Sequence, residues 1–124
     1  MVTTISGSAL ATDNFTLSGI GSGSTSTSTG STTWNLLSAQ TQIITASGAT
    51  TVTITNASST PVGTGFTLIV IDAASASLSI SASPTPKYVD ATAPALNGTS
   101  GEYLIVGLVH VGNGQLLVTS ATVS

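Results

Sequence analysis

The sequence predicts an all-β fold, a compact antiparallel β-sandwich or jelly-roll-like barrel that carries an extended N-terminal arm. After residue 33, turn-forming residues recur at intervals of roughly 8–12 residues, a spacing typical of sandwiches and barrels. Patterns typical of helices are nearly absent, and about six to eight short strand-like segments take their place. With 124 residues the chain is long enough for one domain around one core.

A glycine, serine and threonine tract divides the chain. Residues 19–33 read GIGSGSTSTSTGSTT, which is the composition of a flexible linker. We therefore predict an N-terminal arm over residues 1–18, a linker over residues 19–33 and a β domain over residues 34–124. In the arm, Phe15 and Leu17 are spaced as on one face of a short strand. The arm is either a disordered tail or a segment that becomes ordered on a neighbouring subunit.

The first strands of the β domain differ in how many of their faces are apolar. Residues 34–37 and 42–45 are short apolar segments. Residues 50–55 alternate, which places Val52 and Ile54 on the buried face. Thr51, Thr53 and Thr55 are on the other face. Residues 66–71 are apolar on both faces beyond Thr67, so we expect a central strand that is covered on two sides.

The later strands include the clearest hairpin. Residues 77–81 alternate again, and Pro84 and Pro86 follow, which cannot donate to a strand ladder and so mark an edge or a loop. Residues 103–110 and 115–119 are strand-like and flank a Gly-Asn-Gly sequence, which suits the positive φ angles of a tight turn. We expect no helix longer than one turn.

Charged residues are scarce. Only Asp13, Asp72, Lys87, Asp90 and Glu102 are charged, and the formal net charge is −3. One lysine cannot make the several phosphate contacts that nucleic-acid binding requires, and it gives no electrostatic attraction to an anionic membrane. No apolar run approaches the length of a membrane-spanning helix. The absence of cysteine excludes disulfides and thiolate chemistry. We therefore expect neither nucleic acid nor membrane as a partner.

Few groups in the chain are suited to catalysis or metal binding. His110 could form a triad with a serine and Asp72, Asp90 or Glu102, but no G-x-S-x-G motif is present, and we expect His110 at the end of a strand, partly solvated. The same carboxylates and Asp13 could hold a calcium ion, although the favoured alternative is that they are solvated charges at turns. We predict a protein that is not an enzyme, and we assign no catalytic, cofactor-binding or metal-binding residue and no cofactor.

One stretch resembles a known group of proteins. It runs through Gly65-Phe66-Thr67-Leu68-Ile69-Val70, Pro86-Lys87-Tyr88, Thr92-Ala93-Pro94-Ala95-Leu96, Gly101-Glu102-Tyr103-Leu104-Ile105-Val106-Gly107 and Gly112-Asn113-Gly114. This order is similar to the small β domain of tailed-bacteriophage virion surface proteins, such as capsid decoration proteins and tail fibres. The resemblance covers less than half of the chain. It implies a structural protein on the virion surface that commonly forms trimers.

The composition and the resemblance lead to two hypotheses about function. The first is a non-enzymatic capsid decoration, or cement, protein on the capsid surface of the virion. It would form a homotrimer, bind the major capsid protein and stabilise the head through apolar and hydroxyl contacts. The alternative is a tail fibre or appendage protein that binds a host surface receptor. An enzyme acting on surface polysaccharide is the third option, and it would need a pair among Asp72, Asp90 and Glu102.

Overall fold

The structure, a computed structural model, describes residues 24–123 and consists mostly of β-strands. Within these residues the only helical segments are two 3-10 turns, η2 (Ala57–Ser59) and η3 (Val89–Ala91). The all-β prediction is confirmed at this level. The strands are β1 (Thr25–Thr29), β2 (Thr32–Asn35), β3 (Thr41–Ala46), β4 (Ala49–Thr55), β5 (Gly65–Asp72), β6 (Ser77–Ser81), β7 (Lys87–Tyr88), β8 (Tyr103–Gly112) and β9 (Gln115–Val123).

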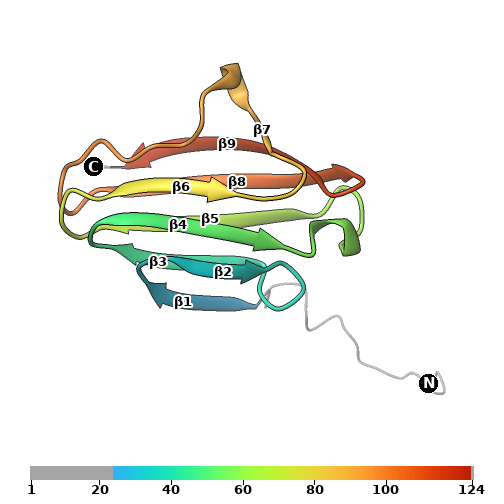
Figure 1. Cartoon of the computed structure of the whole chain (residues 1–124), viewed down its shortest axis with the longest axis horizontal. Coiled ribbons are helices and arrows are strands. Elements are labelled where there is room, and N and C mark those ends of the chain that lie inside the picture. The colour runs from blue at the N-terminus through green and yellow to red at the C-terminus, as the bar shows by residue number, and fades with distance from the viewer. Residues whose placement is uncertain (1–23, 124) are drawn as a thin grey trace, which may run out of the picture.

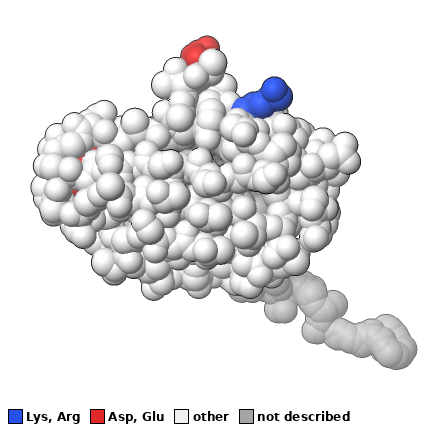
Figure 2. Space-filling model, viewed as in Figure 1, with Lys and Arg blue, Asp and Glu red and all other residues white. Residues whose placement is uncertain are grey.

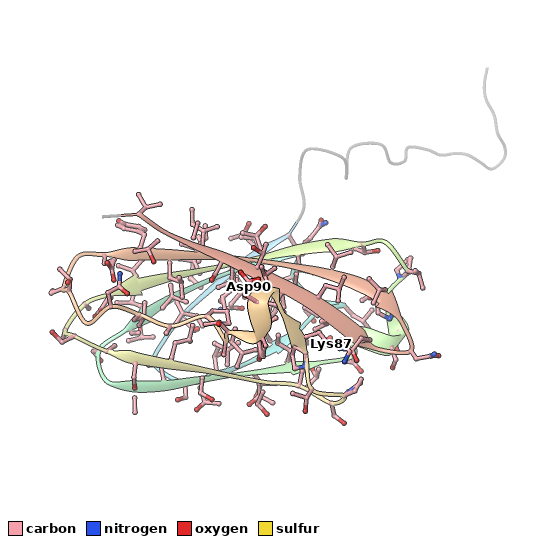
Figure 3. All side chains as sticks on the ribbon, turned by 90° about the horizontal axis from the view of Figure 1, so that it is seen from above. Lys87 and Asp90 are labelled. Atoms are coloured by element: carbon pink, nitrogen blue, oxygen red, sulfur yellow. The ribbon has the colours of Figure 1, made fainter. Side chains whose placement is uncertain are left out.

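Two sheets form the molecule (Figure 1). The larger has the strand order β1-β3-β5-β8-β9-β7, and the smaller has the order β2-β4-β6. Seen from above, they lie as two layers with side chains between them (Figure 3).

The predicted antiparallel arrangement is wrong for the pairing of the first six strands with one another. These strands alternate between the two sheets, so that β1, β3 and β5 are parallel neighbours in one sheet and β2, β4 and β6 are parallel neighbours in the other. Parallel neighbours need a long crossover connection, and here the strand in the opposite sheet supplies it. The two-residue links Gly30-Ser31 and Ser47-Gly48 are therefore corners between sheets and not hairpin turns. The spacing of turn residues, on which the prediction rests, does not distinguish such corners from hairpin turns, because both are short.

The last part of the chain is antiparallel, as predicted. β8 pairs with β5 and with β9 in antiparallel register, and β7 adds to β9 as a short parallel edge strand. The Gly-Asn-Gly turn joins β8 to β9, with φ angles of 53° at Asn113 and 79° at Gly114. These left-handed conformations explain why asparagine and glycine occupy the turn.

The predicted linker is wrong from Thr25 onward. β1 and the first residues of β2 lie inside this tract, and β1 pairs along its whole length with β3. Ser26 and Ser28 hydrogen bond to the side chain of Gln42, which is buried on the neighbouring strand β3. Threonine has a high β-propensity, and these hydroxyls satisfy the buried amide, so a tract with linker composition forms an edge strand. The predicted arm, residues 1–18, lies outside the described residues.

The core lies between the two sheets. Val52 and Ile54 are buried as predicted, and the neighbouring Thr51 and Thr53 face outward. Trp34 anchors the N-terminal end of the core, because its indole N–H donates to the carbonyl of Ala39 at 2.8 Å and its ring packs edge to face against Phe66. The largest fully buried apolar side chains are Trp34, Ile44, Val52, Leu68, Val70, Leu104, Val106, Leu108 and Leu116.

β5 is central in its sheet, as predicted, but it is fully covered on only one face. Its inward side chains, such as Leu68 and Val70, are buried against the smaller sheet. On the other face, Ile69 and Ile71 are only half-buried. β5 is therefore apolar on both faces, but within the described residues only its inner face is fully covered.

Candidate functional site

The uncovered surface extends from β5 across the hairpin β8–β9. We call this outward-facing side of the three strands the outer face. The pairing of β5 with β8 and of β8 with β9 places its side chains in rows across the sheet. Its members are Thr67, Ile69, Ile71, Tyr103, Ile105, Gly107, Val109, Val111, Leu117, Thr119, Ala121 and Val123.

The outer face holds most of the exposed large apolar side chains in the described residues. Nine such side chains are exposed, and six of them lie here with exposed fractions of 40–49%. These six are Tyr103, Ile105, Val109, Val111, Leu117 and Val123. Together they expose on the order of 500 Å² of side-chain surface, which is at the upper end of what a soluble monomer normally presents as one patch and is typical of an interaction site.

None of the charged side chains that the structure describes lies on the outer face. Of the described charged residues, Asp72 and Glu102 are buried, whereas Lys87 and Asp90 lie on the edge strand β7 and the turn η3 that follows it (Figure 3). The opposite side of the molecule is also almost free of charge (Figure 2). A partner on the outer face would therefore be held by apolar burial and hydroxyl contacts, which salt does not screen.

A hollow of about 520 Å³ interrupts the outer face. Its floor includes Gly65 on β5 and Gly107 on β8, which carry no side chains, and Val109, Leu117 and Thr119 contribute to its walls. The pairing register explains its position, because Gly65 lies across from Val109, and Gly107 lies across from Thr119. Two adjacent rows of the sheet therefore each lack one side chain at this point.

His110 is buried, and the prediction that it is partly solvated is wrong. It ends the inward row of β8, as expected from its position next to the turn, but only 2% of its surface is exposed. Gly114 N–H donates to Nε2 at 2.8 Å, so the ring proton resides on Nδ1, which donates to the carbonyl of Thr60 at 3.0 Å. Both ring nitrogens thus join the hairpin turn to the segment after η2. No described carboxylate hydrogen bonds to His110, so the triad considered from the sequence is not assembled.

Asp72 and Glu102 are also buried, so the prediction of solvated charges is wrong for both. Backbone bonds join them, since Asp72 N–H donates to the Glu102 carbonyl at 2.9 Å. Asp72 Oδ1 accepts the N–H groups of Ala74 and Ala76, while its Oδ2 is buried without a partner. Glu102 accepts both the backbone and the side-chain N–H of Asn97. Each carboxylate is thus held mainly by the loop beside it.

The described residues contain no group of three or more potential metal ligands among histidine, cysteine, aspartate and glutamate. Asp13, the remaining carboxylate considered from the sequence, lies outside the described residues. Asp90 is exposed on η3, as expected for a turn, and it adopts a left-handed φ of 55°. Of the carboxylates considered from the sequence as a possible cation site, the structure brings Asp72 and Glu102 together through a backbone hydrogen bond.

The loop before β8 covers part of the core. Tyr88 on β7 packs against the core, and its partial burial raises the pKa of the phenol above its usual value. Lys87, next to it, is exposed. A second hollow, of about 430 Å³, lies between this loop and β9 and is lined by Val89, Asp90, residues 92–95 and residues 118–120.

Comparison with models of known protein families, with curated proteins and with solved structures gives no match for this chain. In the part of the chain that the structure describes, no helix is long and apolar enough to cross a membrane.

The outer face was missed by the sequence reasoning. The prediction for residues 103–110 is a hairpin strand and does not distinguish its two faces. Tyr103, Ile105 and Val109 alternate with the buried Leu104, Val106 and Leu108, so the strand is apolar on both sides. An antiparallel strand with one solvated face normally alternates apolar with polar residues. The continuous apolar pattern next to a hairpin turn was the available signal.

Proposed function

We propose that this chain is a non-enzymatic structural protein of a virion surface, a capsid decoration protein that binds the major capsid protein shell and stabilises the head of a bacteriophage. The observation that carries the proposal is the outer face, a broad uncharged apolar surface on a rigid sheet. Such a surface favours lasting association with other protein subunits. The resemblance of the sequence to phage virion proteins supplies the particular setting.

The chemistry of the outer face suits a shell protein. A particle meets wide changes in salt concentration, which weaken contacts between exposed charges and leave apolar contacts intact. The outer face offers isoleucine, valine and leucine side chains beside threonine hydroxyls, and no charged group. We propose that copies of the chain assemble as a homotrimer and that the same kind of contact attaches them to the capsid.

The order of the strands favours one of the two fold types that the sequence predicts. We propose to classify the two layers as a β-sandwich of mixed pairing and not as a jelly roll, because six successive strands alternate between the sheets. A sandwich of this kind has edge strands, with which a strand of another chain can pair. β1 is an edge strand without charge or proline, a kind of edge that invites pairing with another chain.

The test is to remove the protein from the native particle and measure head stability. We expect heads that lack the protein to burst at a lower temperature or at a milder osmotic shock than complete heads, and we expect added protein to restore stability. Protein with Leu117→Asp, which places a charge on the outer face, should restore head stability poorly. The matched control is Thr53→Asp, which places the same charge on the outward side of β4 and should restore head stability fully. Equal stability of heads with and without the protein would contradict the proposal.

A second candidate is an appendage protein that binds a host surface receptor. The observation that favours it is the loop before β8, which carries the exposed Lys87, Asp90 and Val89 and borders the hollow of about 430 Å³ with mixed polar and apolar walls. Copy number separates the two candidates. Labelled protein present in hundreds of copies over the head supports decoration, whereas a few copies at the tail support receptor binding.

A further inference from the structure

We propose that the hollow at Gly65 and Gly107 receives an apolar side chain from a second copy of this chain and thereby sets the register in which two copies pack. The inference rests on the proposed function, since it assigns the contact through which copies assemble. It identifies a particular point on the outer face as the site of close approach.

The fold does not need glycine at position 65 or at position 107. Neither residue has a left-handed φ. A Cβ placed on Gly107 would lie 3.6 Å from Thr119 Cγ2, and one placed on Gly65 would lie 3.8 Å from the Leu108 carbonyl oxygen. Both distances are ordinary van der Waals contacts, so the methyl group of an alanine fits at either position in the isolated molecule.

Glycine in the interior of a strand weakens that strand. Relative to alanine it costs about 0.5–1 kcal/mol in the interior of an element, because the unfolded chain gains freedom and no side chain packs. Glycine within a strand often marks a point where another molecule or backbone approaches closely. Gly112 and Gly114 differ from Gly107 in this respect, because their positive φ angles explain them within the fold.

The residues that line the hollow indicate which kind of side chain would occupy it. The walls include Val109, Leu117 and Thr119 of the outer face. The exposed Val89 of η3 also lines the hollow, and none of the described lining residues is charged to pair with an ionic ligand. An aliphatic or aromatic side chain would fill the hollow, and the same face carries such side chains exposed beside it, among them Tyr103 and Ile105. A second copy therefore brings both the missing side chain and a second uncharged surface.

The extent of the outer face also fits a second copy. A standard protein interface buries about 800 Å² on each partner. The exposed apolar side chains provide on the order of 500 Å², and the threonines, the half-buried isoleucines and the rim around the hollow can supply the rest. Two such faces meet without like-charge repulsion between their described residues, because the charged side chains that the structure describes lie elsewhere.

The test fills the hollow in the full chain with Gly107→Val, and with Gly107→Ala as a smaller change that keeps the test valid should valine disturb the strand. Sedimentation velocity over a range of concentrations gives the association constant, and Trp34 fluorescence during heating reports the fold. We expect the wild type to associate, Gly107→Val to associate at least tenfold more weakly with its melting temperature kept or raised, and Gly107→Ala to lie between. Thr53→Val adds the same valine outside this face and should associate like the wild type.

Two results would overturn the inference. One is a folded Gly107→Val protein that associates as strongly as the wild type, in which case the hollow is not the contact while the proposed function is untouched. The other is a wild type that remains monomeric and yet loses capsid binding when Gly107 is replaced, in which case the occupant is a capsid protein and not a second copy. Failure of the proposed function would be seen separately, as unchanged head stability in particles that lack the protein.

Discussion

Replacement of His110 by alanine should destabilise the fold more than any other single change at the hairpin turn. In the wild type the imidazole Nε2 accepts Gly114 N–H at 2.8 Å, and Nδ1 donates to the Thr60 carbonyl at 3.0 Å. Alanine removes both partners in a region that excludes water, since His110 is 2% exposed. The turn then loses its connection to the segment that follows η2.

The magnitude follows from two contributions. A buried donor left without an acceptor costs about 1–3 kcal/mol, and this applies to Gly114 N–H. Loss of the buried ring and the space it leaves add about 1–2 kcal/mol. We therefore expect the free energy of unfolding to fall by about 3 kcal/mol, a large share of the total stability of a small domain.

Urea denaturation measured by Trp34 fluorescence gives the assay, because Trp34 is the only tryptophan in the chain and is buried in the core. With a slope of about 1.5 kcal/mol per molar urea, the midpoint should fall by about 2 M. Protein concentration is held constant, because association adds to stability. His110→Gln, whose side-chain oxygen can replace Nε2 as the acceptor, should lose less than half as much, and Val111→Ala on the outer face about 0.5 kcal/mol. A loss below 1 kcal/mol for His110→Ala, or an equal loss for His110→Gln, would refute the reasoning.

Three further predictions concern the loops and β7. Asp72→Ala removes the acceptor of two backbone N–H groups and should cost about 2–4 kcal/mol in urea unfolding, whereas Asp72→Asn keeps the Oδ1 acceptor and should cost less than half of that; equal losses would contradict this account. Gly114→Ala should lower the melting temperature more than Gly98→Ala, because both have positive φ but only Gly114 is crowded, with Pro84 Cδ and Ser58 Cβ 3.4 Å from the added Cβ; the reverse order would contradict it. Because burial raises the pKa of Tyr88, the folded protein keeps this phenol protonated where the unfolded chain has begun to ionise, so its contribution to stability is complete below the unfolded pKa of 10.0 and is lost as pH rises through the folded pKa. Absorbance titration at high pH should show a late-ionising tyrosine that disappears in Tyr88→Phe and persists in Tyr103→Phe.

Much of the local structure was predictable from residue order. The alternation of residues 50–55, the hairpin at Gly112-Asn113-Gly114 and the loop that contains Pro84 and Pro86 all lie where the sequence placed them. Each depends on neighbours within a few residues, through side-chain alternation or the φ angle that a residue tolerates. The burial of His110, Asp72 and Glu102 was not predictable in this way. Their partners are mostly backbone groups, with the Asn97 side chain in addition at Glu102, and these adjoin them only once the loops have folded.

The sequence by itself determined that the chain forms strands, where its last hairpin turns and that it has almost no charge with which to bind a partner. Only the tertiary structure decided which strands are neighbours. A two-residue link such as Ser47-Gly48 is compatible both with a hairpin and with a corner between sheets, and the choice depends on where the buried faces of distant strands meet. The same choice put the second apolar side of β5, β8 and β9 on the surface. Local pattern fixes which side chains share a face, but only the packing of the whole chain determines which face is covered.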